Sequence, residues 1–243
     1  MAFVDNRHLF PMAFAQYEEF ISQNIVLTDT PEAIMLRQVG ERLADASYKW
    51  LSSLGHGHYL DAYEWEFTLI KDDAINAWVM PGGKIVFYTG ILPVTKNEAG
   101  IAVVMGHEIA HALLNHGQQR MSAGILQQIG AVGLVVGMEV AGVSPEAQAA
   151  WMLAYGAGTA LGGTLPFSRQ HENEADYYGL ILMTIAGYDP AEAAAFWDRM
   201  NALGGASIPQ FLSTHPSSAN RSRQLRNWIP EAERKAAEIR ANF

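Results

Sequence analysis

Two histidines and a glutamate lie close together in VVMGHEIAHALLNHG, residues 103–117, an otherwise apolar stretch. Residues four apart in an α-helix lie on one face, a turn apart, so His107 and His111 can direct both imidazole rings at one point. Burying polar groups costs free energy unless each group finds a partner. A metal ion is the partner that would compensate both rings at once.

The spacing is typical of a catalytic zinc site. Such a site has three protein ligands, here two imidazoles and a carboxylate, and keeps a fourth position for water. Glu108 follows the first histidine directly, so it falls beside the metal and is placed as the general base for the bound water, whose pKa the metal lowers towards 7. We therefore predict one zinc ion, bound by His107 and His111, with Glu108 in catalysis.

The third ligand is predicted in a second segment, SRQHENEADYYG, residues 168–179. Glu172 and Asp176 are four residues apart, so both can lie on one face of a helix. Glu172 can then bind zinc, while Asp176 accepts a hydrogen bond from a ligand histidine, which we assign as His107. A carboxylate in that position orients the ring and raises its basicity.

Two further polar residues near these motifs are not assigned to the metal. His116 comes five residues after His111, and position 114 is not glycine, so the metzincin extension of the motif fails. We expect His116 to be a polar residue near the end of the helix. Glu174 lies on a different side of its helix from Glu172, and we expect it to be solvated.

The elements that must position these residues follow from the apolar pattern. Residues 11–50 have the spacing of helices, and residues 64–70, EWEFTLI, alternate as a strand does. NAWVM and KIVFY flank Pro81-Gly82-Gly83, so residues 76–88 are predicted to form a β-hairpin. Thr95 and Glu98 have the spacing of a capping box that opens the HEIAH helix. Asp189, Pro190 and Glu192 predict a later helix start.

Composition bounds the remaining possibilities. The 243 residues are 49% hydrophobic and have no linker, repeat or charge run, which indicates one domain, and the net charge of −9 argues against nucleic-acid binding. Residues 221–243 carry a charge of +3, which suits a solvated helix surface or, alternatively, contact with an anionic membrane. The chain contains no cysteine, which excludes disulfides and thiolate sites. No signal peptide or membrane span is visible, so we expect a soluble protein.

The motifs together resemble the gluzincin metalloproteases that include the CAAX prenyl proteases, the HtpX membrane proteases and the periplasmic BepA-like proteases. HEIAH matches the zinc helix of that family, and ENEAD matches its Glu-x-x-Ala-Asp motif, whose first Glu is the third ligand. NAWVMPGGKIVFYTGIL, residues 76–92, looks like the hairpin before the active-site helix. STHPSSANR, residues 213–221, looks like the downstream His-Pro loop with its following Arg.

The resemblance implies a mainly helical α+β fold of the zincin type, with a small β-sheet that includes the hairpin. We expect one domain over residues 1–243, with N-terminal helices over 1–60, the zincin core over 61–228 and a C-terminal helix over 229–243. Residues 7–45 look like the N-terminal helices of the bacterial lipoprotein branch. The resemblance therefore implies a periplasmic or cell-envelope location and a possible lipid anchor that this chain lacks.

The function implied is that of a zinc-dependent endopeptidase that cleaves misfolded or unassembled envelope proteins. The alternative is an assembly factor or chaperone-like protein with a latent or structural zinc site. A strictly structural site would have four protein ligands and no adjacent Glu, so Glu108 favours chemistry. Residues 121–165, rich in Gly and Ala, fit either helix packing or a lid over the site.

Two further parts of the site are expected to serve substrate and turnover. An extended peptide can add to the edge of the first hairpin strand, which is formed by Asn76, Ala77, Trp78, Val79 and Met80. In related proteases the His-Pro loop lies near the active site, so His215 can either occupy the fourth zinc position as a latch or donate a hydrogen bond to the oxyanion. We favour the latch, and Arg221 would add positive charge in the oxyanion role.

Overall fold

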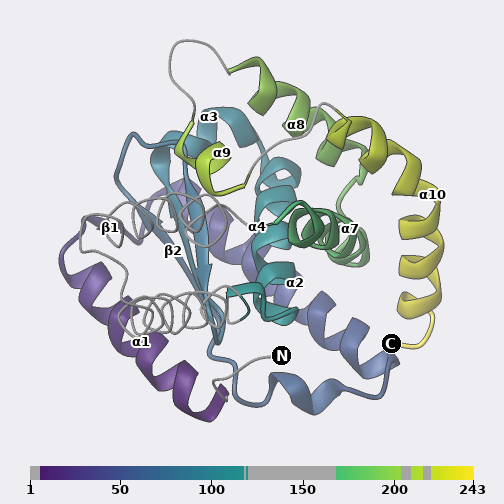
Figure 1. Cartoon of the computed structure of the whole chain (residues 1–243), viewed down its shortest axis with the longest axis horizontal. Helices are drawn as coiled ribbons and strands as arrows, with labels where there is room; N and C mark the ends of the chain where they lie inside the picture. The colour runs from purple at the N-terminus through teal and green to yellow at the C-terminus, as the bar shows by residue number, and fades with distance from the viewer. Residues whose placement is uncertain (1–5, 118, 120–167, 204–208, 216–219) are drawn as a thin grey trace, which may run out of the picture.

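The computed structural model describes residues 6–117, 119, 168–203, 209–215 and 220–243. In this part of the chain, helices surround a small mixed sheet, which confirms the predicted α+β class (Figure 1). Residues 121–165, for which helix packing and a lid were the alternatives, lie outside the described residues.

The elements follow one another in a simple order. The first part comprises α1 (Asn6–Ser22), β1 (Val26–Leu27), α2 (Pro31–Ser53) and η1 (Gly57–Leu60). The sheet and the motif helix follow as β2 (Glu66–Ile70), β3 (Ala77–Met80), β4 (Lys84–Tyr88), η2 (Thr89–Ile91), α3 (Leu92–Thr95) and α4 (Glu98–Leu113). The last part comprises α7 (Arg169–Ile185), α8 (Ala191–Ala202), α9 (Gln210–Thr214) and α10 (Arg221–Arg240).

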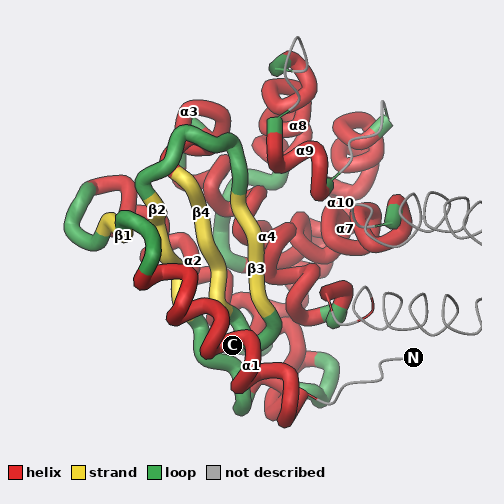
Figure 2. The backbone as a smooth tube through the Cα atoms, turned by 60° about the vertical axis from the view of Figure 1, so that its left-hand side comes forward, coloured by secondary structure: helices red, strands yellow, loops and turns green. Residues whose placement is uncertain are grey.

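The sheet has the strand order β1-β2-β4-β3, with β2 and β4 parallel and both outer pairs antiparallel. Its strands are covered on both faces, because alternate side chains pack against different helices. Ile70 and Val86 face Tyr17 of α1, whereas Ile85 and Phe87 belong to the main core with α2 and α4. Figure 2 shows α1 lying across the sheet and β3 beside α4.

The predicted hairpin over residues 76–88 is confirmed by the antiparallel pairing of β3 with β4. Gly82 and Gly83 in its turn have φ of 87° and 98°, a left-handed conformation that favours glycine. The turn brings β4 to the middle of the sheet and leaves β3 at its edge.

Helix α4, which carries the motif, lies in the centre of the fold, with every residue from Gly100 to Leu113 buried. The capping prediction for this helix was wrong: Thr95 is the last residue of the short helix α3, and Lys96, at φ 67°, terminates that helix. Asn97 caps α4 instead, because its Oδ1 accepts a hydrogen bond of 2.9 Å from the amide of Gly100.

The predictions for the later helices agree with the structure in part. Asp189 Oδ1 accepts a hydrogen bond from the amide of Ala191, where α8 begins, as the Asp-Pro signal predicted. The helix predicted over 229–243 is only the second half of α10, which begins at Arg221 and continues through Pro230. Among the described helices, none combines the length and apolar character needed to cross a membrane.

Candidate metal centre

Helices α4 and α7 bring the two motifs together by a close backbone approach. A Cβ placed on Gly106 would lie 2.9 Å from the carbonyl oxygen of Gly179, and one on Gly179 would lie equally close to the amide of His107. Only glycine at both positions lets the helices pack at this distance. The contact sets His107 of α4 opposite Glu172 and Asp176 of α7.

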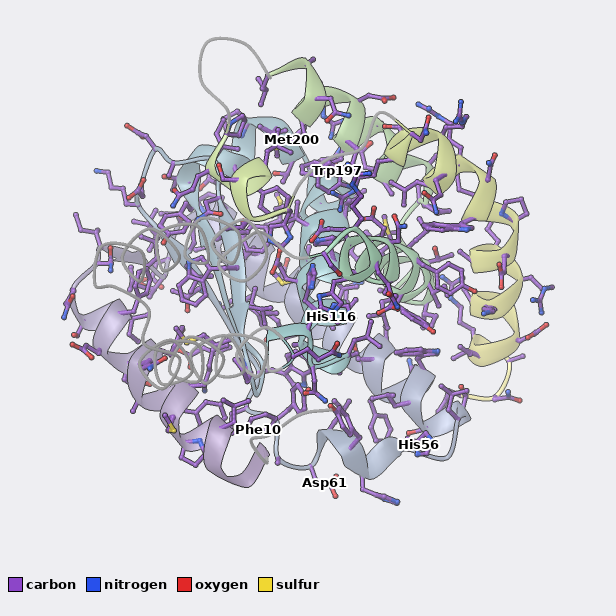
Figure 3. The ribbon with its side chains drawn as sticks, in the orientation of Figure 1. Phe10, His56, Asp61, His116, Trp197 and Met200 are labelled. Atoms are coloured by element: carbon purple, nitrogen blue, oxygen red, sulfur yellow. The ribbon has the colours of Figure 1, made fainter. Side chains whose placement is uncertain are left out.

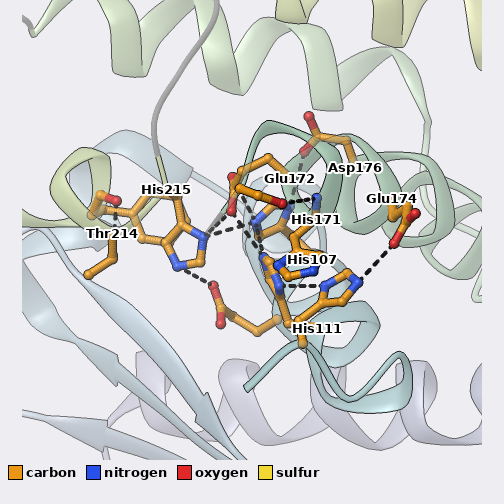
Figure 4. A network of polar contacts seen from close by, with 12 residues as sticks. His107, His111, His171, Glu172, Glu174, Asp176, Thr214 and His215 are labelled. Atoms are coloured by element: carbon orange, nitrogen blue, oxygen red, sulfur yellow. Dashed lines mark hydrogen bonds and ion pairs between the residues drawn. The ribbon is translucent and has the colours of Figure 1, made fainter. Parts of the chain in front are cut away.

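Four buried side chains converge between these helices and the end of α9: His107, His111, Glu172 and His215 (Figure 4). One ligand atom from each lies within 4.8 Å of all the others. His111 Nε2 is 3.0 Å from His107 Nε2 and 3.3 Å from Glu172 Oε1. His215 Nδ1 is 3.0 Å from the same Glu172 oxygen, so the predicted ligands meet at one point and the predicted loop histidine joins them.

Asp176 makes the contact that the sequence predicted, with Oδ1 3.0 Å from His107 Nδ1. Arg221 holds this carboxylate from the other side, through hydrogen bonds of 2.6 Å from both Nε and Nη2. The same guanidinium lies 3.0 Å from Glu172 Oε2 and 3.3 Å from the centre of the Trp197 ring. Arg221 therefore orients two carboxylates of the site, whereas the sequence suggested it only as added positive charge if His215 acts on the oxyanion.

Glu108 lies beside the cluster and is 1% exposed. Its Oε1 accepts no hydrogen bond from the described residues, although His215 Nε2 is 3.4 Å away. Burial raises the pKa of Glu108, and the nearby carboxylate of Glu172 adds to this, while His215 and His107 oppose it. A carboxyl group with a raised pKa is suited to accept a proton and release it again.

Burial and the contacts among the ligands also determine which of the ligand side chains are charged. Burial alone would raise the pKa of Glu172, but the charge and hydrogen bonds of His107, with those of His111 and His215, hold it well below its usual range. Burial lowers the pKa of His111 well below its ordinary value. A carboxylate and a neutral imidazole are the forms that bind a metal ion.

His116 lies just after the end of α4, as expected, but its burial and its contact with Glu174 were not predicted. His116 is fully buried, with Nδ1 2.9 Å from His111 Nδ1 and Nε2 3.0 Å from Glu174 Oε2. Figure 3 shows His116 in the interior, whereas His56 lies at the periphery. Burial lowers the pKa of His116 to about 4, although Glu174 opposes this. In a continuous helix His116 would point about 140° away from His111, so periodicity could not reveal the contact.

The strand predicted to bind substrate lies next to the centre. β3 packs against α4, and no described strand pairs with its outer edge. Asn76 is buried just before β3 and its carbonyl accepts a hydrogen bond from the amide of Tyr88. The carbonyl of Ile75 accepts one of 2.9 Å from Phe211 of α9, which ties the strand to the helix that ends at His215.

The residues present fit one zinc ion. Two imidazole nitrogens and a carboxylate are the donor set of catalytic zinc sites, and the chain has no thiolate that would favour a different site. Each ligand histidine has its second ring nitrogen against a polar partner, Asp176 for His107 and His116 for His111, as metal-bound histidines generally have. The buried Glu108 oxygen without a hydrogen bond is a further group that water on the metal would satisfy.

Comparison with known proteins gives the same answer at the level of the family. The model of "Peptidase family M48" matches residues 36–229. The chain is 40% identical over 172 residues to the mitochondrial metalloendopeptidase OMA1 of Schizosaccharomyces pombe, covering 70% of this chain and 48% of that protein. It is 34% identical over 220 residues to the Saccharomyces cerevisiae protein of the same name, covering 86% and 59%. The β-barrel assembly-enhancing protease of Escherichia coli is 33% identical over 169 residues, covering 66% and 34%.

These alignments span less than two thirds of each relative, so they bear on the shared domain and not on the whole of those proteins. They include a bacterial protein of the kind that the motifs resembled, together with mitochondrial proteins. The match over 36–229 contains all four residues of the metal cluster.

Proposed function

We propose that this chain, which belongs to peptidase family M48, is a zinc-dependent endopeptidase. The observation that carries the proposal is the position of Glu108, buried beside a cluster of three histidines and a glutamate. A structural zinc site has no use for a buried carboxyl group that lies next to its ligands without binding the metal. The rival function, an assembly factor with a structural or latent zinc site, leaves Glu108 unexplained.

The side chains divide the chemistry of peptide hydrolysis among them. His107, His111 and Glu172 would hold the zinc ion, which would supply the Lewis acidity that activates water and polarises the scissile carbonyl. Glu108 accepts the proton of the attacking water and returns it to the leaving amine. Asp176 orients the His107 ring, and Arg221 fixes Asp176 and Glu172 in turn.

The substrate binds as an added strand on the edge of β3 in this proposal. Asn76 and Tyr88 are a hydrogen-bonded pair, and such pairs alternate along an antiparallel ladder. The register pairs Val79 with Ile85, one of the positions whose backbone groups point away from the neighbouring strand. Val79 can therefore bond an extended peptide without breaking the hairpin, and main-chain bonds demand no fixed sequence.

His215 is proposed as a latch on the fourth metal position. Its Nδ1 faces the cluster, 3.2 Å from His107 Nε2, while its Nε2 lies 3.4 Å from Glu108. One imidazole in this position competes with water for the metal and contacts the general base as well. The alternative is the oxyanion donor, and the two roles predict opposite effects of removing the ring.

We propose misfolded or unassembled cell-envelope proteins as the substrates, and the periplasm or envelope as the location. The name of the Escherichia coli relative, a protease that enhances β-barrel assembly, supports an envelope substrate. The relatives named as mitochondrial favour an organelle instead, so neither the bacterial periplasmic branch nor a lipid anchor follows from the comparisons. Purification of the native protein from cell fractions decides between these locations.

The test of the activity is casein degradation by wild type and Glu108→Gln, with the zinc content of both measured. We expect equal zinc content and loss of degradation, because the amide keeps the shape of the side chain but accepts no proton. Glu98→Gln is the matched control, since Glu98 lies on the same helix with a half-exposed side chain. Degradation that survives Glu108→Gln would overturn the proposal.

A further inference from the structure

The chain turns sharply after the motif helix, and two tyrosines hold the turn. Tyr59 Oη donates a hydrogen bond of 3.1 Å to the carbonyl of Leu113, and Tyr63 Oη donates one of 3.1 Å to the carbonyl of Ala112. Asn115 has φ 57° and donates a hydrogen bond of 2.7 Å from Nδ2 to Tyr59 Oη. The left-handed residue ends α4 and returns the chain, which places His116 against His111.

His116 bridges His111 of α4 and Glu174 of α7. Its two ring nitrogens lie 2.9 Å from His111 Nδ1 and 3.0 Å from Glu174 Oε2, and the ring of His171 stacks on it at 4.3 Å and 18°. Glu174 also accepts a hydrogen bond of 2.9 Å from Gln170. Glu174, His116 and His111 therefore form a hydrogen-bonded series with a defined geometry at both contacts.

The positions of the protons in this hydrogen-bonded series follow from the metal site. His111 Nε2 faces His107 and Glu172, so its lone pair is the one offered to zinc and its proton is on Nδ1. A proton on His111 Nδ1 requires an acceptor, so His116 Nδ1 has the lone pair and His116 Nε2 has the proton. That N–H points at the Glu174 carboxylate, which accepts the hydrogen bond.

We propose that His116 is the positioning residue of His111: it accepts a hydrogen bond from the Nδ1–H of this ligand, fixes its tautomer and holds its Nε2 lone pair toward the metal. The inference rests on the proposed zinc site. His107 has a carboxylate partner clamped by Arg221, whereas His111 has an imidazole partner backed by a carboxylate that is 38% exposed. The two ligand histidines are thus oriented by different chemistry, from opposite sides of the cluster.

The test separates the acceptor role of His116 from its bulk. His116→Asn places an amide oxygen where Nδ1 lies, so it can accept the hydrogen bond from His111 Nδ1–H, whereas His116→Gln places its amide where Nε2 lies. Competition with a chelator gives the zinc Kd of each variant. We expect His116→Gln and His116→Ala to weaken zinc binding about 10- to 100-fold, and His116→Asn to restore most of the affinity. His56→Ala, an exposed histidine outside the cluster, is the control.

A second measurement needs no substitution, so it holds even if a variant fails to fold. In zinc-loaded wild type with 15N-labelled histidine, long-range NMR correlations show which nitrogen of each ring is protonated, and we expect the Nε2–H tautomer for His116. The Nδ1–H tautomer, or zinc affinities of His116→Gln and His116→Ala equal to wild type, would overturn the inference alone. Wild type that binds no zinc would overturn the proposed function, and this inference with it.

Discussion

Replacing Arg221 by leucine should destabilise the zinc-free protein by about 3–5 kcal/mol, the usual cost of removing one partner from a buried ion pair. The guanidinium makes hydrogen bonds of 2.6 Å to both Asp176 oxygens and lies 3.0 Å from Glu172 Oε2. All three side chains are 4% exposed, so water cannot replace the lost partner. In a chain of this length the melting temperature should fall by roughly 10 °C.

Urea unfolding in the presence of a chelator measures this change, because zinc would otherwise stabilise the fold through its ligands. Adding Asp176→Asn to Arg221→Leu removes one unpaired charge, so the double variant should recover about 1 kcal/mol or more relative to additivity. Arg221→Lys keeps the charge but loses the paired hydrogen bonds, and should lie between wild type and Arg221→Leu.

Arg226→Leu is the matched control on the same helix. Arg226 pairs with Asp198 at 2.5 Å, but both side chains are about half exposed, so its loss should cost less than about 1 kcal/mol. A loss of stability in Arg221→Leu no larger than in this control, or an effect that simply adds to that of Asp176→Asn, would contradict the prediction.

Three further changes probe the metal site and the substrate strand. His215→Ala should raise peptidase activity if the ring is a latch and lower it by about 10²-fold if it is an oxyanion donor; unchanged activity and zinc content would reject both roles. Val79→Pro should raise the Michaelis constant for peptides with zinc still bound, and unchanged kinetics would exclude strand addition at this position. Burial alone would lower the pKa of His107, but Glu172 and Asp176 raise it to about 9. A proton therefore competes with zinc below that pH, and zinc affinity should fall about tenfold for each unit that the pH decreases; an affinity independent of pH would contradict this.

The helical spacing of the motifs was enough to predict much of this site. His107 and His111, and likewise Glu172 and Asp176, are four residues apart, and regular helices place both pairs on one face. The hairpin was equally readable, because its turn residues and its alternation agree. These features depend only on local backbone geometry, which the residues of one short segment determine.

The features that the sequence did not reveal depend on breaks in that geometry. Asn97 rather than Thr95 caps α4, because Thr95 belongs to the preceding helix α3 and Lys96, at φ 67°, separates the two helices. His116 reaches His111 only through the left-handed turn at Asn115, which two distant tyrosines hold. Likewise, nothing near Arg221 in the sequence indicates that its guanidinium binds Asp176, 45 residues away.

We infer that one zinc ion compensates the burial of His107, His111 and Glu172. Anomalous diffraction at the zinc absorption edge, from crystals of the zinc-loaded protein, locates that ion. We predict one peak per chain, about 2.0–2.2 Å from the Nε2 atoms of His107 and His111 and from a carboxylate oxygen of Glu172. Zinc bound elsewhere in the chain, or no peak between these three side chains, would contradict the claim.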